Sequence, residues 1–246
     1  MALYCIADLH LSTNRNTDKK MDVFGNRWQN YHEKIDASWR RLVEPQDAVI
    51  LPGDISWATR LEEAEDDFSY LDSLPGEKYI GKGNHDFWWA TAAKLQEFFR
   101  ARSFNTLHIL YNNAYRIEDK IVCGTRGWFL DEKNQVVAQG EVDYDKIVKR
   151  EAGRLKMSLD AAKILQSEAA EGGQTLPILA FLHFPPVWSD FCCRELIDLL
   201  LAYGVNDCYF GHIHGCYSLP GEFVFEGIRF HLIAADYLSF APLLIR

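Results

Sequence analysis

The sequence predicts an α/β fold, and two patterns in its 246 residues carry that prediction. Short, uninterrupted apolar runs recur along the chain, and amphipathic stretches lie between them. Uninterrupted apolar runs are typical of strands that are covered on both faces, whereas a helix of a globular protein keeps one polar side. The sequence contains no internal repeat and no low-complexity tract, so we expect a single domain that spans residues 1–246.

The apolar runs predict the strands in chain order. Five main strands are expected at residues 3–7, 48–52, 78–80, 178–182 and 207–210. Shorter strands are expected at residues 107–110, 114–117, 121–123, 223–225 and 229–234. Asp119 and Lys120 stand between two of the shorter runs, where a hairpin turn is expected although the favoured glycine is missing.

The amphipathic stretches predict the helices. They are expected at residues 28–42, 59–71, 91–102, 144–170 and 191–202. In the fourth stretch, Leu155 and Leu159 belong to a broken apolar stripe with charged residues elsewhere, and Gly172 and Gly173 follow as a C-cap. Residues 130–143 are polar and show no period, so we expect a loop or lid there.

The charge balance bears on the class of partner. Lys plus Arg number 26 against 35 for Asp plus Glu, which gives a formal net charge of -9. Proteins that bind long nucleic acids use basic side chains to displace counterions, so we expect no such partner. No apolar run approaches the roughly 20 residues that span a bilayer, and the first residues lack the basic region of a secretory signal. We therefore expect a cytoplasmic protein with no membrane partner.

Each main strand is followed by side chains that can bind a metal ion. In chain order these candidates are Asp8, His10, Asp54, Asn84, His183, His212 and His214. Ligands of open α/β sheets bind beyond the carboxyl ends of the strands. We therefore expect the five polar clusters to converge at one edge of one sheet.

The types of side chain in these clusters indicate the chemistry. Carboxylate, imidazole and amide groups suit divalent metals of intermediate hardness, and seven of them are too many for one tetrahedral zinc. They fit two ions that share a ligand, and Asp54 is the natural bridge because its two oxygens can reach both. Two such ions can clamp a phosphoryl group and lower the pKa of a bridging water. The pattern predicts phosphoester hydrolysis by a metal-bridging hydroxide.

Each cluster also has a simpler interpretation when it is taken alone. Asp8 with His10, and Gly53 with Asp54, are typical of tight turns. His183 could be a neutral core histidine that hydrogen-bonds within the protein. Five ordered clusters, each at the end of an apolar run, are hard to produce by turn chemistry alone, so the set favours a metal site.

Taken together, the clusters resemble the five ordered motifs of the calcineurin-like metallophosphoesterase superfamily. The resemblance covers residues 3–214 and rests on Asp8-x-His10, Gly53-Asp54, Gly83-Asn84-His85-Asp86, His183 and Gly211-His212-x-His214. It implies a four-layer α/β/β/α sandwich of mixed sheets with the site at the carboxyl ends of the strands. The strands from Phe223 onward would belong to the second sheet.

The resemblance also implies how two metal ions would be held. The first ion would be bound by Asp8, His10, Asp54 and His214. The second would be bound by Asp54, Asn84, His183 and His212. Mn, Fe, Zn, Co and Ni all accept such ligands, and Mn is the ion we expect to support activity in vitro.

Two further residues acquire catalytic roles from the resemblance. His85 would lie on the substrate side, where it protonates the leaving oxygen or stabilises charge in the transition state. Asp86 would orient the His85 imidazole. The alternative is that His85 only packs beside Asn84.

The sequence lacks residues that are typical of particular branches of this superfamily, and these differences narrow the class of expected substrates. The residues after Asp54 lack the arginine of protein serine/threonine phosphatases, and Trp57 stands where purple acid phosphatases have a tyrosine ligand. His85 replaces the arginine found in lipid A pathway pyrophosphatases. The remaining branches are bacterial-type phosphodiesterases and phosphomonoesterases, so a small phosphate mono- or diester is the expected substrate.

Three loop residues are candidates for contact with that substrate. Trp88 could stack on a base or wall an apolar leaving group, and Arg126 and Arg15 could clamp a phosphate oxygen. The alternatives are an aromatic residue that plugs the core and ordinary solvated arginines. Two other functions stay open, a catalytically weak metal-binding scaffold of the same fold and a Mn-dependent nuclease, and the sequence leaves the oligomeric state open.

Overall fold

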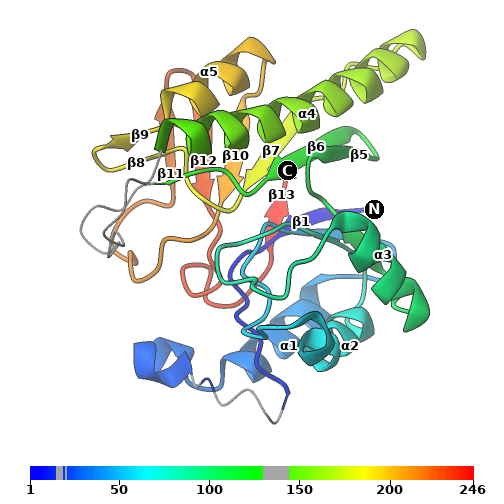
Figure 1. The fold of residues 1–246 in the computed structure, drawn as a ribbon, viewed down its shortest axis with the longest axis vertical. Coiled ribbons are helices and arrows are strands. Elements are labelled where there is room, and N and C mark those ends of the chain that lie inside the picture. The colour runs from blue at the N-terminus through cyan, green and yellow to red at the C-terminus, as the bar shows by residue number, and fades with distance from the viewer. Residues whose placement is uncertain (15–18, 20, 130–143) are drawn as a thin grey trace.

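A computed structural model of the chain describes residues 1–14, 19, 21–129 and 144–246. These residues form two sheets packed face to face, with helices on the outer face of each sheet (Figure 1). The molecule is a four-layer α/β/β/α sandwich, as expected. Within the described ranges, no helix combines the length and the apolar character needed to cross a membrane.

In the described residues, the first sheet has five strands in the order β13-β1-β2-β3-β4. Their bounds are β1 (Leu3–Cys5), β2 (Ala48–Leu51), β3 (Glu77–Ile80), β4 (Leu107–Ile109) and β13 (Leu243–Ile245). Strands β1 to β4 are parallel to their neighbours, and β13 pairs antiparallel with β1. Strand β13 was not among the predicted strands, because a three-residue run lacks a visible period.

The second sheet has six strands in the same described part of the chain, in the order β11-β12-β10-β7-β6-β5. Their bounds are β5 (Asn113–Ile117), β6 (Lys120–Thr125), β7 (Ile178–Leu182), β10 (Asp207–Phe210), β11 (Glu222–Phe225) and β12 (Ile228–Leu232). The four inner strands are parallel, and β5 and β11 run antiparallel at the edges. The strands after residue 222 therefore belong to the second sheet, as the resemblance implied.

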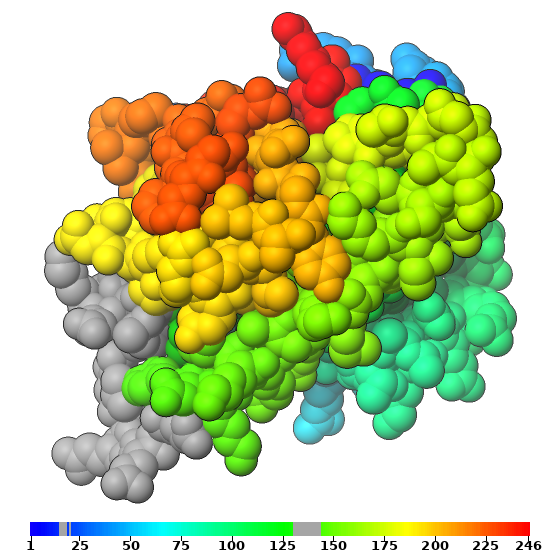
Figure 2. Space-filling model, turned by 90° about the horizontal axis from the view of Figure 1, so that it is seen from above, coloured from blue at the N-terminus to red at the C-terminus, as the bar shows by residue number. Residues whose placement is uncertain are grey.

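The helices close the sandwich from both sides. Below the first sheet in Figure 1 lie α1 (Tyr31–Leu42), α2 (Glu65–Ser73) and α3 (Ala92–Ala101). Helices α4 (Tyr144–Glu171) and α5 (Arg194–Ala202) cover the second sheet and lie side by side on the face shown in Figure 2. Short 3₁₀ segments precede α1 and α2: η1 (Met21–Phe24), η2 (Asn26–Trp28) and η3 (Leu61–Ala64).

The two-sided burial of β1 shows why its apolar run is uninterrupted. Tyr4 and Ile6 point into the core under α1 and α2, whereas Leu3, Cys5 and Ala7 point into the layer between the sheets. Successive side chains of a strand face opposite sides, so a strand in this position has no polar side.

The expectation of one sheet is wrong. Three of the five polar clusters follow β1, β2 and β3 of the first sheet, and two follow β7 and β10 of the second. An uninterrupted apolar run shows that both faces of a strand are covered, but it cannot show whether a helix or a second sheet covers them. The sheets are joined next to the site, because Ala7 N donates to Ile233 O at 2.8 Å and Ala235 N donates to Ala7 O at 2.9 Å.

Several element boundaries also differ from the expectation. The helices expected at residues 28–42 and 59–71 begin only at Tyr31 and Glu65, because 3₁₀ segments precede them. The predicted helix at residues 191–202 begins only at Arg194, because Phe191–Cys192 form β9 and pair with β8 (Val187–Trp188). The hairpin turn between β5 and β6 is centred on Glu118 and Asp119, and Glu118 adopts the left-handed conformation with φ 51°. Glu118 thus adopts the left-handed conformation that glycine usually adopts in such turns.

Candidate metal centre

The candidate ligands lie where the carboxyl ends of both sheets meet. Asp8 and His10 follow β1, and Asp54 follows β2. Backbone hydrogen bonds tie these two loops together, since Asp8 N donates to Gly53 O at 3.1 Å and His10 N donates to Asp54 O at 2.9 Å. From the second sheet, Gly211 N donates to His183 O at 3.1 Å, which holds the loop after β10 beside the loop after β7.

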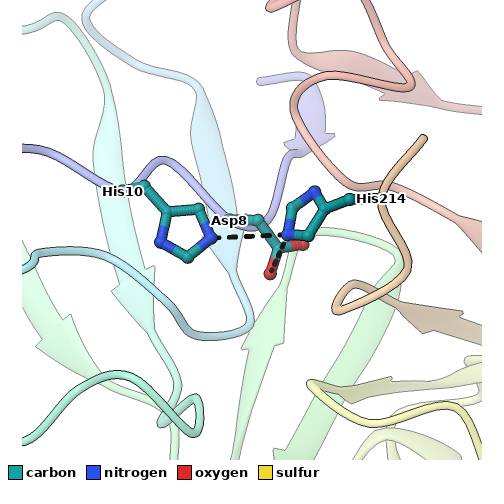
Figure 3. A group of neighbouring side chains, drawn as sticks. All are labelled: Asp8, His10 and His214. Carbon is teal, nitrogen blue, oxygen red and sulfur yellow. Dashed lines mark hydrogen bonds and ion pairs between the residues drawn. The ribbon is translucent and has the colours of Figure 1, made fainter. Parts of the chain in front are cut away.

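Asp8, His10 and His214 form the first group of side chains (Figure 3). His10 Nε2 lies 3.4 Å from His214 Nε2, and His214 Nε2 lies 3.9 Å from Asp8 Oδ1. One ligand atom from each of the three residues falls within 4.8 Å of the others. The structure therefore brings together three of the four ligands expected for the first ion.

Asp8, Asp54 and His183 form a second group with the same spacing, so Asp8, which was expected to bind the first ion alone, occurs in both groups. His183 Nδ1 lies 3.7 Å from Asp8 Oδ1, and His183 Nε2 lies 2.6 Å from Asn84 Oδ1. The His212 backbone N–H donates to both oxygens of Asp8, at 3.1 and 2.9 Å, and its ring centroid lies 5.3 Å from that of His183. The ligands expected for the second ion are thus gathered around His183.

Asp54 belongs to the second group and also lies close to His10 of the first. Its Oδ2 is 3.7 Å from His10 Nε2 and 3.6 Å from His183 Nε2, so one oxygen is nearly equidistant from an imidazole of each group. Its Oδ1 accepts a hydrogen bond from His85 N at 2.8 Å. This is the position that a carboxylate shared by two cations would occupy.

The electrostatics of the centre fit cations. Asp8 and Asp54 are 0% and 1% exposed, and burial raises the pKa of Asp8 to about 7 and that of Asp54 well above its ordinary value. Burial lowers the pKa of His10 and His183, which favours neutral imidazoles that can donate a lone pair. Divalent ions would supply the missing positive charge and return both carboxyls to the ionised form.

A ring nitrogen of the centre supports the same fit. His183 Nδ1, which lies 3.7 Å from Asp8 Oδ1, is buried and has no hydrogen-bond partner in the part of the chain that the structure describes. Buried polar atoms without a partner are rare in folded proteins and are costly unless an ion or water satisfies them. The donor types, their burial and this unpartnered nitrogen together fit divalent metal ions.

Backbone strain is concentrated at the same residues. Asp8, His10, Asp54 and His212 have φ values of 59°, 46°, 51° and 68°. Left-handed φ is uncommon in residues other than glycine, and such strain collects at functional sites, where the surrounding fold must hold it. The backbone hydrogen bonds from Asp8 and His10 to the loop after β2 stabilise these strained residues. The strain therefore favours a metal site over simple turns.

The glycines of the motifs make room for the carboxylates. A Cβ atom on Gly83 would lie 2.0 Å from Asp54 Oδ1, and one on Gly211 would lie 2.3 Å from Asp8 Oδ2. Both distances are far below van der Waals contact. Glycine is needed at these positions because the ligand carboxylates occupy the space that any other side chain would fill.

Asp86 has a different role from the one expected. Its Oδ2 accepts hydrogen bonds from Asp54 N at 2.8 Å and Gly83 N at 2.7 Å, and its Oδ1 accepts from Ile55 N at 2.8 Å and Trp88 Nε1 at 3.1 Å. Among the described residues, no hydrogen bond joins it to the His85 imidazole. Asp86 therefore fixes the backbone of the loops that carry Asp54 and Asn84.

His85 is half-buried at the edge of the centre. Its ring centroid lies 5.7 Å from that of His10 and 4.6 Å from that of Trp57. Burial lowers the pKa of His85, and the nearby positive groups of Lys19 and His214 lower it further. His85 is placed to touch a substrate bound at the centre without occupying a ligand position.

The side chains of the two described candidates for substrate contact, Trp88 and Arg126, are engaged away from the ligands. The expectation for Trp88 is wrong, because its side chain is 2% exposed and packs edge-on against Phe68 at 4.9 Å in the core under the first sheet. The guanidinium of Arg126 is paired with buried Glu151 of α4 at 3.3 Å, although its carbonyl accepts from His183 N at 3.1 Å. Arg15 and the expected loop or lid at residues 130–143 lie outside the described residues.

Sequence analysis missed Asp236, a buried carboxylate that contacts a candidate ligand. Its Oδ1 lies 2.8 Å from His214 Nδ1, and its Oδ2 accepts from Gly215 N at 3.1 Å and Tyr217 OH at 2.9 Å. Burial tends to lower the pKa of His214, but the hydrogen bond to Asp236 and the negative charges of Asp236 and Asp8 outweigh it and raise that pKa. The signal that could have revealed Asp236 is the one shared by the other candidates. Asp236 directly follows an apolar run, the one that continues from β12.

Replacing Asp236 with asparagine is expected to weaken metal binding at the first group by about 10- to 100-fold, because a carboxylate orients a ligating imidazole and raises its basicity. Titration of the metal-free protein with Mn²⁺ measures the effect. Asp207→Asn is the matched control, since Asp207 pairs with His231 at 2.9 Å at the opposite end of the same sheet. Equal Mn²⁺ affinity in wild type and Asp236→Asn would contradict the role of Asp236.

Comparisons with known proteins bear on the fold and on the family of the chain. The chain is similar in structure to TT1561 of Thermus thermophilus, with a TM-score of 0.54, 13% identity, and 99% and 97% of the two chains covered. It is also similar to AQ665 of Aquifex aeolicus, a protein of unknown function, with a TM-score of 0.47, 15% identity, and 99% and 95% covered. No curated protein matches the sequence significantly. A family model for calcineurin-like phosphoesterases matches residues 1–216, and the chain belongs to this family.

Proposed function

We propose that the protein hydrolyses a small phosphate ester with the help of two divalent metal ions. The observation that carries the proposal is the position of Asp54 Oδ2 between His10 and His183, at 3.7 and 3.6 Å, so that this carboxylate reaches an imidazole of each group of ligands. Family membership supports phosphoester chemistry. The net charge of -9 favours a small ester over a long nucleic acid.

The residues divide between the two ions as follows. The first ion would be held by Asp8, His10, Asp54 and His214. The second would be held by Asp54, Asn84, His183 and His212. Bound ions would polarise the phosphoryl oxygens and lower the pKa of a water to near neutrality.

The protein's own residues then orient the reaction. Asp86 holds the backbone of Gly83 and Asp54, so the ligand loops stay in place when a substrate enters. Asp236 holds the His214 ring through Nδ1, which leaves Nε2 facing Asp8 and His10. His85 stands beside the centre, where its protonated form, the imidazolium, would give a proton to the leaving oxygen of the ester.

Metal removal tests the proposal. We expect chelated protein to lose hydrolysis of a panel of phosphomonoesters, cyclic phosphodiesters and linear phosphodiesters, and readdition of Mn²⁺ to restore it. Metal analysis at saturating Mn²⁺ should find two ions per chain. Full activity in metal-free protein, or fewer than one ion per chain, would contradict the proposal, and rapid digestion of long DNA would favour the nuclease alternative.

A further inference from the structure

A cavity of about 300 Å³ opens directly beside the candidate metal centre. Its wall includes His10, His85, His214 and Asp236, so it is continuous with the first group of ligands. Pockets of this size are large enough for part of a small-molecule ligand. The cavity is therefore the space into which a substrate bound at the centre extends on this side.

The rest of the wall is dominated by aromatic rings from four segments of the chain. They are Phe24, Trp28, Trp57 and Tyr217. Met21, whose flexible thioether suits contact with rings, completes this apolar wall. Such a wall offers few hydrogen-bond partners, so it suits an apolar or aromatic part of a ligand better than a group made of hydroxyls alone.

Contacts with the ligands hold two of these rings in place. The Trp57 ring stacks on the His10 ring with centroids 4.8 Å apart and planes 22° apart, and its Nε1 lies 3.0 Å from Met21 Sδ. The Trp28 ring lies edge-on to the His214 ring at 5.7 Å. The wall is thus preorganised by the same imidazoles that would bind metal, which lowers the entropy lost on binding a flat group.

Phe24 and Tyr217 stand at the mouth of the cavity. Phe24 is 65% exposed and Tyr217 is 44% exposed, although both are large apolar side chains. The guanidinium of Arg27 covers the Tyr217 ring at 4.2 Å, and Lys19 Nζ lies 4.3 Å from the centre of the Trp57 ring. Phe24 is therefore the residue whose ring contributes most to the accessible wall.

The position of His85 determines which part of a substrate enters the cavity. His85 lines the cavity and is also the residue proposed to protonate the leaving oxygen. If the phosphoryl group lies over the ions and the leaving oxygen lies beside His85, the carbon group attached to that oxygen must extend into the cavity. The non-leaving substituents of the phosphorus point elsewhere.

We propose that the cavity binds an aromatic ring carried by the leaving alcohol, as in an aryl-substituted alcohol or a nucleoside. Rings pack on aromatic walls with more energy than their buried area alone provides. The inference rests on the proposed function for the orientation of the substrate. The binding of the ring itself is measured without turnover, so the two ideas can fail separately.

The first experiment measures binding of two phosphonates to the Mn²⁺-treated protein by calorimetry. 2-Phenylethylphosphonate and 2-cyclohexylethylphosphonate have the same charge and chain length and differ in aromaticity. We expect the phenyl compound to bind about 3- to 10-fold more tightly. Equal affinity, tighter binding of the cyclohexyl compound, or no binding of either would overturn the inference.

Variants of Phe24 then test whether this residue causes the preference for the phenyl compound. Phe24→Leu keeps an apolar side chain without the ring and should remove most of the preference, whereas Phe24→Tyr should keep it. Phe87→Leu is the matched control, because Phe87 is also exposed and close to His85 but does not line the cavity. An equal loss of preference in the Phe24 and Phe87 variants would place the ring elsewhere and overturn the inference.

Hydrolysis of paired substrates distinguishes the two sources of the ring. Benzyl phosphate is compared with cyclohexylmethyl phosphate, and a nucleoside 5′-monophosphate with ribose 5-phosphate, so that each pair keeps a similar leaving oxygen. A preference of kcat/KM in the first pair alone indicates an aryl alcohol, and one in the second pair indicates a nucleoside. Hydrolysis with no preference in either pair overturns the inference and leaves the proposed function intact. Ring-selective binding without any hydrolysis supports the inference and contradicts the proposed function.

Discussion

Replacing Asp54 with asparagine is expected to leave at most one metal ion per chain and to lower kcat/KM by about 10³-fold or more. The substitution keeps the shape of the side chain and tolerates the left-handed φ of 51°, but it removes the charge that lies between His10 and His183. Metal ions contribute several kcal/mol of transition-state stabilisation, and about 4 kcal/mol corresponds to about 10³-fold in rate. Metal analysis and kinetics on a phosphoester with an activated leaving group measure both effects.

Asp47→Asn is the control for this prediction. Asp47 is also a buried carboxylate, but it precedes β2, at the end of the strand opposite to Asp54, where it accepts hydrogen bonds from Ala2 N and Glu44 N. We expect this variant to keep two ions and most of the activity, even if its stability falls. Retention of two ions by Asp54→Asn would show that Asp54 is not the shared ligand.

Replacing His85 with alanine is expected to preserve metal binding and to lower the rate by about 10²- to 10⁴-fold, the usual contribution of a general acid. The loss should depend on the leaving group. An alkyl phosphate needs its leaving oxygen protonated, whereas 4-nitrophenyl phosphate releases 4-nitrophenolate, which leaves readily as an anion. We therefore expect a large loss on benzyl phosphate and a much smaller one on 4-nitrophenyl phosphate.

The dependence on the leaving group separates catalysis from packing. A residue that only packs beside Asn84 would, when removed, affect both substrates equally and disturb metal binding. His108→Ala is the control, because His108 is a half-buried histidine paired with Glu77 at 2.6 Å in the first sheet and outside the centre. Equal losses on both substrates in His85→Ala would favour the packing role.

The candidate ligands could be predicted from the sequence because their signal is local. Each follows an apolar run, and the order of the five motifs is preserved along the chain. The glycines of the motifs were part of that signal, but their reason became visible only in the structure. Gly83 and Gly211 approach the carboxylates of Asp54 and Asp8, from other loops, too closely for any side chain.

The roles of the neighbouring residues could not be predicted in the same way. Asp86 is adjacent to His85 in sequence, yet its carboxylate points to the backbone of Asp54 and Gly83. Trp88 is close to the motif, yet it belongs to the core. In a loop, neighbouring side chains point in different directions, and only the backbone conformation decides which of them faces the site.

The sequence by itself determined the α/β class, the main strands and the identity of the residues that can bind metal, because strand periodicity and side-chain chemistry are local properties. The tertiary structure decided that these strands belong to two sheets, that Asp54 lies between the imidazoles, and that Asp236 holds His214. The aromatic cavity beside His85 was decided there too, since its wall joins Phe24, Trp57 and Tyr217. Such contacts depend on the order and stacking of strands, which long-range packing sets and no local pattern records.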